Sequence, residues 1–299
     1  MTTFLAIVID GLIYASWLFV MAAGLTLIYG VMRILNMAHG SFYSIGAYTS
    51  ASLVGWYFSH NGVPAAGSFV VMALGALAVG VVAGLAVERG ILRFFQEREE
   101  VIMVLVTFGL LLVFEDLIKM VWGVQSYYAP EPYSLLGSTD IGDLTFVNYD
   151  LAMICVAALV ALVLWWSLNR TRMGKLLRAV IHDREIAIAM GVNVNRLFAI
   201  TFAIGAGLGA LAGGLIAPAT AVTPGLGIEV IVLAFAVVVT GGLGSIQGAL
   251  VGAVLIGLAR SAAVNLFPQA ELFVIYGVMA LVLVFRPRGL FALASARRI

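Results

Sequence analysis

Long apolar runs, separated by short polar segments, dominate the chain. A helix that crosses the hydrocarbon core of a bilayer needs about 20 apolar residues, and most of the runs approach or exceed that length. The seventh run is short and is joined to the eighth by GGLGSIQG, so this pair forms either two spans or one re-entrant hairpin. The pattern predicts an all-α polytopic membrane protein with eight or nine transmembrane helices. The expected spans are residues 6–31, 40–58, 67–88, 101–122, 150–168, 197–217, 228–243, 248–267 and 270–285.

Composition points to the same class. Hydrophobic residues make up 63% of the 299 residues and charged residues only 10%, whereas a soluble domain is about one quarter charged. The 33 glycines suit helices that pack closely through small residues, and they argue against a β-barrel. The single cysteine, Cys155, excludes a disulfide framework. The net charge of +1 excludes nucleic acid as a partner.

Basic residues lie almost entirely in alternate loops. Of the sixteen Lys and Arg residues, all except Lys119 and Arg260 follow the first, third, fifth or ninth expected span, and the C-terminal ones include Arg297 and Arg298. Cytoplasmic loops carry an excess of Lys and Arg. We therefore expect the N-terminus outside, the C-terminus in the cytoplasm, and the polar segment 170–196 on the cytoplasmic side.

The segment 170–196, RTRMGKLLRAVIHDREIAIAMGVNVNR, contains the signals of a short helix. Asp183 is a suitable N-cap, and Gly191 is a suitable residue just beyond the C-terminus. They predict a helix from Arg184 to Met190, which is too short to be stable in water alone. We expect packing to hold it in place.

Two interpretations of this helix remain open. Ile186 and Met190 are spaced i, i+4 and form one apolar strip. The segment is either an interfacial loop that obeys the charge rule, or a docking helix that inserts into a groove of a partner protein.

Several separated motifs carry a family resemblance. Glu185-Ile186-Ala187, with Gly191 six positions after the Glu, resembles the E-A-A-x-x-x-G loop of bacterial ABC importer permeases. Further matching stretches are YGVMRILNMAHGSFYSIGAY (29–48), GVNVNRLFAITFAIGA (191–206), GGLGSIQGALVGA (241–253) and RPRGLF (286–291). Over nearly its whole length, the chain resembles the branched-chain amino acid (LivH-type) permeases.

This resemblance implies one transmembrane permease domain over residues 1–299, with a cytoplasmic coupling loop at 170–196, in the bacterial inner membrane. It also implies partners: two ABC ATPase subunits, which bind ATP and Mg²⁺, a second related permease subunit in a heterodimer, and a periplasmic or extracellular substrate-binding protein. The chain itself is expected to bind no cofactor and to have no catalytic site, because no phosphate-binding loop or catalytic constellation occurs in it. The implied ATPase-coupling residues are Arg184, Glu185, Ile186, Ala187, Ile188, Met190 and Gly191.

The implied substrates are branched-chain or other hydrophobic amino acids. Residues 231–240, IVLAFAVVVT, contain no basic residue where some amino-acid permeases of this type carry a Lys. Importers of urea, amides, or organic and aromatic acids therefore remain alternatives. A different class, an ATP-independent channel or secondary transporter, would need a titratable group inside the membrane, such as Glu115 or Arg260. The spacing of Glu115 and Lys119, i and i+4, favours an ion pair instead.

Three groups of polar or glycine residues are candidates for the pathway or its gating. The first, at the expected cytoplasmic junction of spans one and two, forms either a turn whose His caps carbonyls or a gating element; no metal ligands are spaced around its His. The second, the glycine-rich loop, is expected to form a hinge or a tight packing corner, and its amides would contact a carboxylate substrate if it broke within the bilayer. The third, one mid-span Arg, must face protein or a cavity. These residues are Asn36, His39, Gly40 and Ser41; Gly241, Gly242, Gly244, Ser245 and Gln247; and Arg260.

Overall fold

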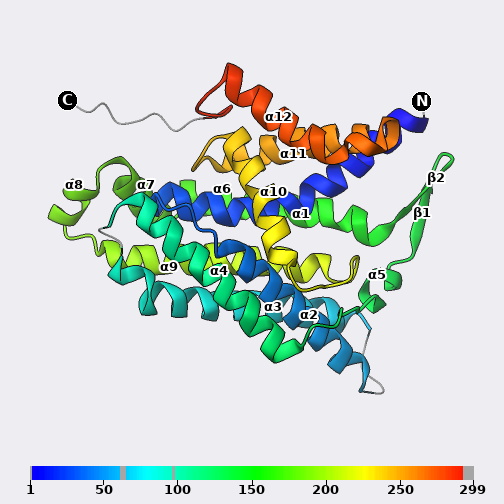
Figure 1. Ribbon diagram of the computed structural model, residues 1–299, viewed down its shortest axis with the longest axis horizontal. Helices are drawn as coiled ribbons and strands as arrows, with labels where there is room; N and C mark the ends of the chain where they lie inside the picture. The colour runs from blue at the N-terminus through cyan, green and yellow to red at the C-terminus, as the bar shows by residue number, and fades with distance from the viewer. Residues whose placement is uncertain (1, 61–64, 96–97, 292–299) are drawn as a thin grey trace.

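The computed structural model describes residues 2–60, 65–95 and 98–291, and it is predominantly helical (Figure 1). Arg297 and Arg298, counted above among the basic residues, lie outside the described part. Each expected span coincides with a helix. In chain order the elements are α1 Thr2–Met32, α2 His39–Phe58, α3 Gly67–Gly90, η1 Leu92–Phe94, α4 Glu100–Trp122, α5 Glu131–Leu135, β1 Ser138–Ile141, β2 Leu144–Val147, α6 Asn148–Arg170, α7 Arg172–His182, α8 Arg184–Ala189, α9 Val194–Ile216, α10 Leu226–Gly241, α11 Ile246–Leu266, η2 Pro268–Ala270 and α12 Glu271–Phe285.

The helices confirm an all-α polytopic membrane protein. Among the described residues, seven helical segments are long and apolar enough to cross a membrane: α1, α3 with η1, α4, α6, α9, α11, and η2 with α12. Helix α2 has 20 residues but includes four serines and a histidine, and α10 has only 16 residues. Both of these shorter or more polar helices are packed inside the bundle, which explains how they tolerate their composition.

Helix α9 lies at the centre. Buried residues make up 83% of its apolar window, against 17% for α6 and 11% for the η2–α12 segment. Its sequence is rich in small residues, which allow neighbouring backbones to approach closely. A Cβ atom on Gly213 would overlap the Tyr43 carbonyl of α2, and one on Gly205 would overlap Ile28 of α1. Glycine packing therefore builds the core around α9.

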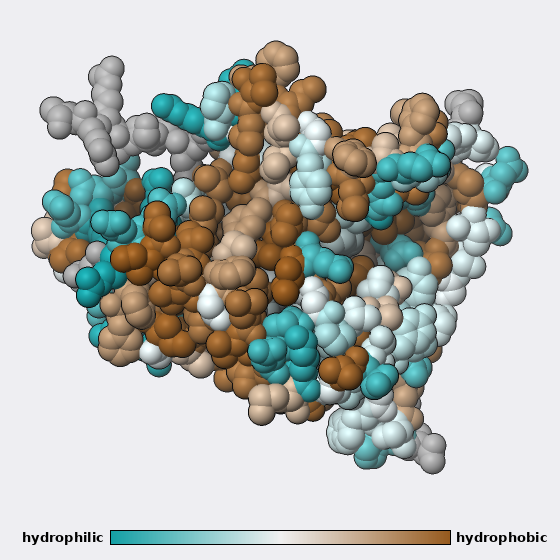
Figure 2. Space-filling model, in the orientation of Figure 1, coloured by the Kyte–Doolittle hydropathy of each residue, from teal (hydrophilic) through white to brown (hydrophobic). Residues whose placement is uncertain are grey.

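The two ends of the molecule differ in character. Helices α7 and α8 lie at one end, together with Arg33, and this is named the basic end (Figure 1). The β1–β2 hairpin and α5 lie at the opposite end, named the hairpin end, where the chain also begins. Strands β1 and β2 pair antiparallel around a turn with Gly142 at φ +67°. In Figure 2, apolar side chains cover the middle of the visible face, and hydrophilic ones gather mainly toward its ends.

Candidate functional site

The predicted short helix at the basic end is present and fully capped. The Asp183 Oδ1 accepts a hydrogen bond from the Ile186 N–H at 2.9 Å. At the other end, Gly191 has φ +82° and donates to the Ile188 carbonyl at 2.9 Å, while the Val192 N–H donates to the Ala187 carbonyl at 3.0 Å. These two bonds form a Schellman motif, which satisfies carbonyls that a helix end would otherwise leave free. The caps hold this six-residue helix rigid.

Helix α8 has one buried and one exposed side. Ala187 is 5% exposed and packs in an apolar cluster that includes Leu177 of α7 and Leu197 of α9. On the other side, three apolar side chains are exposed. Proteins rarely expose a group of apolar side chains at a polar end unless a partner binds there. This surface is therefore a candidate contact site for another protein. The group, named the α8 tip, consists of Ile186 (62% exposed), Ile188 (52%) and Met190 (80%).

Helix α8 connects directly to the central helix. Asn193 caps α9, because its Oδ1 accepts a hydrogen bond from the Arg196 N–H at 2.9 Å. The Arg184 guanidinium lies over the ring of Phe198 in α9, 5.4 Å from its centroid. Displacement of α8 would therefore act on α9. The coupling role assigned to Arg184, Glu185 and their neighbours stays a prediction.

The junction between α1 and α2 is buried in protein. The sequence placed Asn36, His39, Gly40 and Ser41 at a membrane edge, and the structure encloses all four residues within the helix bundle. His39 is fully buried, and its Nε2 lies 3.1 Å from the Met21 carbonyl. Met21 precedes the end of α1 by 11 residues, or about 16 Å of helix. The chain re-enters the bundle after Arg33, and α2 begins inside it (Figure 1).

Buried polar groups surround the start of α2. Among the described residues, both side-chain heteroatoms of Asn36 and the hydroxyls of Ser41 and Ser44 are buried without a hydrogen-bond partner. Gly40 is in backbone contact with Gly227, at the start of the short helix α10. Two helix beginnings thus meet inside the bundle. A buried polar group without a partner costs about 1–3 kcal/mol, and the gating role of this region stays a prediction.

The glycine-rich loop forms a tight packing corner. Helix α10 ends at Gly241 and α11 begins at Ile246, with Gly242 and Gly244 at φ +110° and +82°. The Ser245 Oγ caps α11 by accepting a hydrogen bond from the Gly248 N–H at 3.0 Å.

The C-terminal motif RPRGLF packs onto this same corner. Leu290 donates a backbone hydrogen bond to Thr240 at 3.0 Å, and Phe291 donates one to Gly241 at 2.8 Å. Gln247 lines a cavity of about 940 Å³ beside Arg33. Two motifs that are separate in the sequence therefore form one structural unit at the basic end.

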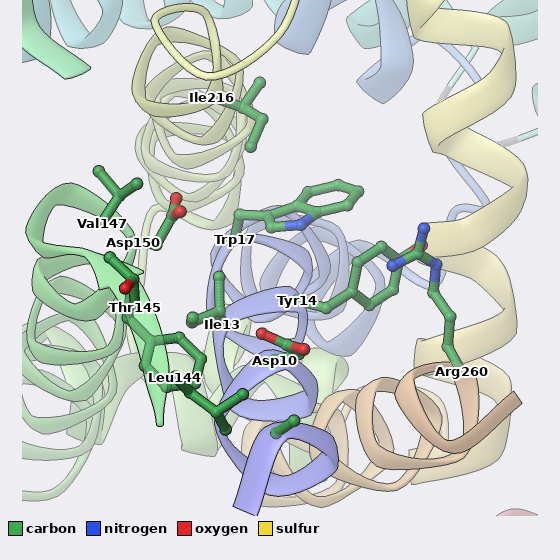
Figure 3. A pocket seen from close by; sticks show the side chains of 12 residues that line it. Asp10, Ile13, Tyr14, Trp17, Leu144, Thr145, Val147, Asp150, Ile216 and Arg260 are labelled. Carbon is green, nitrogen blue, oxygen red and sulfur yellow. The ribbon is translucent and has the colours of Figure 1, made fainter. Parts of the chain in front are cut away.

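A second cavity, of about 410 Å³, opens at the hairpin end (Figure 3). Helices α1, α6, α9 and α11 and strand β2 contribute its walls. Charged groups, aromatic rings and aliphatic side chains all reach it, so it offers several kinds of contact to one ligand. This hairpin-end pocket is lined by Ala6, Asp10, Ile13, Tyr14, Trp17, Leu144, Thr145, Phe146, Val147, Asp150, Ile216 and Arg260.

Arg260 is held in place at the pocket by two neighbours. Its guanidinium forms an ion pair with Glu271 of α12 and lies 4.0 Å from the ring centroid of Tyr14. Arg260 therefore has a structural partner and also lines a cavity, while its place on the transport pathway stays a prediction. Figure 3 shows its side chain reaching from α11 toward Tyr14 on α1.

Asp150 is positioned from outside the pocket. The Tyr133 hydroxyl donates a hydrogen bond to the Asp150 Oδ2 at 2.7 Å. Burial and this hydrogen bond raise the pKa of Tyr133 well above its usual range, so the hydroxyl keeps its proton. A carboxylate has further lone pairs to offer, and Asp150 can therefore serve Tyr133 and a ligand together.

Sequence reasoning weighed Arg260 but missed Asp10 and Asp150. A signal was present for Asp10, because a carboxylate within the first apolar span is expensive unless it faces protein or a cavity. Asp150 stands at the first turn of α6, where it looks like an ordinary helix-start residue. Only the fold shows that these groups share a pocket with Arg260.

Glu115 has a different partner from the one expected. Its Oε1 accepts a hydrogen bond from the Gly225 N–H at the start of α10, where a helix N-terminus favours negative charge. Lys119 lies 4.0 Å from Glu115 but 3.4 Å from Asp116. The predicted ion pair is therefore present only as the longer of two contacts, and Glu115 serves mainly to hold α10 against α4.

The bundle of apolar helices, its glycine-packed centre and its cavities at two ends define a multi-pass membrane protein of the permease type. The profile of the family described as "Branched-chain amino acid transport system / permease component" matches residues 7–283. The chain belongs to this family, which confirms the resemblance seen in its motifs.

Similar curated proteins span nearly the whole chain. The high-affinity branched-chain amino acid transport system permease protein BraD of Pseudomonas aeruginosa is 28% identical over 291 residues, 94% of each chain. The corresponding LivH protein of Salmonella typhimurium is 27% identical over 296 residues, 96% of this chain and 95% of LivH. The ribose import permease protein RbsC of Escherichia coli is 28% identical over 249 residues, 81% of this chain and 73% of RbsC.

Proposed function

We propose that this chain is the transmembrane permease subunit of a bacterial ABC importer for branched-chain and other hydrophobic amino acids. Family membership and the near full-length similarity to BraD and LivH support the substrate class. The basic end faces the cytoplasm, in line with the excess of Lys and Arg there, and the hairpin end faces outward. The subunit lies in the inner membrane as one permease domain over residues 1–299, with its coupling loop at 170–196.

The observation that carries the coupling role is the α8 tip. A capped helix presents Ile186, Ile188 and Met190 to solvent, while Ala187 anchors it to α9. An amphipathic helix of this kind fits a hydrophobic groove on a partner protein. Two ABC ATPase subunits, which bind ATP and Mg²⁺, supply that groove, and this chain performs no catalysis itself.

The central helix provides the route for coupling. When the ATPases close on ATP, the α8 tip is pushed and α9 moves with it. Helix α9 packs along α1, α2 and α3 through small residues, so its displacement shifts the wall of the pathway. Rigid-body movement of packed helices is an established form of such transitions. A second, related permease subunit completes the pathway, and a substrate-binding protein delivers amino acid to the hairpin end.

Reconstitution tests this proposal. The chain is co-expressed with the ATPase, second permease and binding protein of its transport system, and the purified complex is placed in proteoliposomes. We expect uptake of labelled leucine that requires ATP and loaded binding protein, and that stops when the phosphate-loop Lys of the ATPase is replaced. Uptake of leucine driven by a proton or sodium gradient without ATP would instead identify a secondary transporter. ATP-driven uptake of urea or an organic acid, without leucine, would overturn the substrate class.

A further inference from the structure

The hairpin-end pocket suggests what the permease itself recognises, and the inference rests on the proposed function. Its volume of about 410 Å³ is within the range of roughly 300–1,000 Å³ that small-ligand sites occupy. Asp10 lies eight residues into α1, or about 12 Å along the helix. The pocket therefore extends along α1 from Ala6 to Trp17.

Charges of both signs face the pocket, and negative charge is in excess. Asp10 enters from α1, Asp150 from α6 and Arg260 from α11 (Figure 3). Glu271 of α12 already pairs with Arg260. In the part of the chain that the structure describes, neither Asp10 nor Asp150 lies within ion-pair distance of a basic side chain. Two carboxylates are thus left to attract a cationic group.

Aromatic rings add to the attraction for a cation. Asp10, Tyr14 and Trp17 follow at helical spacing on one face of α1, and all three line the pocket. The rings of Tyr14 and Trp17 meet edge to face with centroids 5.1 Å apart. Such faces attract ammonium groups, and Tyr14 already holds the Arg260 guanidinium in this way.

The remaining wall is aliphatic. Ile13 of α1, Leu144 and Val147 of β2, and Ile216 at the end of α9 supply branched side chains to the cavity. A ligand that fits this pocket carries a cationic group, an anionic group and a compact apolar body.

We propose that the hairpin-end pocket receives an α-amino acid with an aliphatic side chain on its way into the pathway. The ammonium group lies between Asp10 and Asp150. The carboxylate binds Arg260, whose five N–H donors exceed what Glu271 alone can use. The side chain lies against Ile13, Leu144 and Ile216. A neutral solute such as urea lacks both charges, and an organic acid lacks the group that the two carboxylates select.

Cysteine protection tests occupancy directly. Cys155 lies outside the pocket lining and is replaced by Ser, after which Thr145, which lines the pocket, is replaced by Cys. Thr139 on the paired strand is the matched control, since each threonine makes one side-chain hydrogen bond of 2.6 Å and only Thr145 lines the cavity. Labelling with a methanethiosulfonate is timed on the full complex in nanodiscs, without binding protein.

Saturating L-leucine is expected to slow labelling of T145C roughly tenfold, the effect of about 1.4 kcal/mol of protection, and to leave T139C unchanged. Isoamylamine, which keeps the ammonium group, protects partly, and 4-methylpentanoate does not protect. Equal labelling of T145C with and without leucine overturns the proposal. Protection by 4-methylpentanoate equal to that by leucine also overturns the proposal, because the carboxylates of Asp10 and Asp150 would then not select for an ammonium group.

Transport separates failure of the pocket from failure of the proposed function. We expect Asp10→Asn and Asp150→Asn to deliver roughly tenfold less leucine per ATP hydrolysed, since each variant loses a charge-assisted hydrogen bond to the ammonium group. Asp143→Asn, in the turn of the same hairpin and outside the pocket lining, should match wild type. If wild type transports leucine and all three variants equal it, the pocket proposal alone is wrong. If wild type shows no ATP-driven uptake of leucine, the proposed function is wrong.

Discussion

The α8 tip and the hairpin-end pocket are built in opposite ways. The tip comes from one short stretch, Asp183 to Val192, whose backbone is capped at both ends and whose apolar side chains point outward. The pocket is assembled from residues between Ala6 and Arg260, and its charged groups point inward. A surface that receives a protein needs a rigid local shape, whereas a site for a small ligand needs groups converging from several elements. The difference supports the proposed division into mechanical coupling at one end and recognition at the other.

One helix connects the two regions. Four residues separate the end of α8 from the start of α9, and the last residue of α9, Ile216, lines the pocket. Helix α9 is therefore a direct structural connection between the α8 tip and the pocket. The predictions that follow test whether the two regions have separate functions.

The largest effect is expected for the double variant Ile186→Asp, Met190→Asp. Both side chains are exposed, so stability should stay within about 0.5 kcal/mol of wild type. Loss of two apolar anchors, each worth about 1.5–3 kcal/mol when buried, should lower stimulated ATP hydrolysis at least about a hundredfold. ATPase activity and thermal melting of the complex measure the two quantities.

Phe94→Asp provides the control for this variant. Phe94 is 73% exposed and lies in η1 near the same end. The Phe94→Asp variant should keep stimulated ATP hydrolysis within a few-fold of wild type. Equal losses in the two variants would show that general surface polarity, and not the α8 tip, governs assembly with the ATPase.

A smaller effect is expected for Gly191→Ala. Gly191 has φ +82°, and an added Cβ would meet nothing within 4 Å, so the cost is backbone strain of about 1–2 kcal/mol. A penalty of this size changes a conformational equilibrium roughly 5- to 30-fold, and stimulated ATP hydrolysis should fall accordingly. Gly123→Ala also has a positive φ and open space around it, but Gly123 ends α4 at the other end and its ψ of −168° is a conformation that only glycine adopts readily. Its complex should lose at least as much stability as the Gly191→Ala complex, while hydrolysis stays coupled to transport.

The smallest effect is expected for Tyr133→Phe. The change removes one hydrogen bond to Asp150, worth about 0.5–1.5 kcal/mol, and should lower leucine delivered per ATP a few-fold. The pKa of the Tyr133 hydroxyl is raised above the usual range of tyrosine. The hydroxyl therefore keeps its proton and donates the hydrogen bond at every pH below that range. The hydrogen bond is lost only when the pH rises above the raised pKa. Between pH 7 and 9 the ratio of variant to wild-type delivery should stay constant. A ratio near one at every pH in that range would show that Tyr133 does not position Asp150.

Local patterns predicted the helices and the α8 tip well, because each depends on consecutive residues. Apolar runs located the helices, and Asp183 and Gly191 marked the ends of α8 to within one residue. The pocket depends on contacts between distant elements, so only its mid-span Arg260 stood out. The complete burial of His39 was not predicted, because a polar turn after an apolar run looks the same at a membrane edge as inside a bundle. The contacts that distinguish the buried position are those of Gly24 and Gly209 with the His39 ring.

The buried start of α2 has a consequence for how the protein enters the membrane. Backbone that is not helical is tolerated at membrane depth only where protein covers it. The backbone of Leu35 and Met37 has that cover from α4, because the Met37 N–H donates to the Thr107 Oγ1 at 3.2 Å and this hydroxyl lies 3.3 Å from the Leu35 carbonyl. Helix α4 is synthesised after α1 and α2. We therefore expect the first two helices to complete their packing only once α4 is present, so that the order of synthesis and the order of assembly differ in this permease.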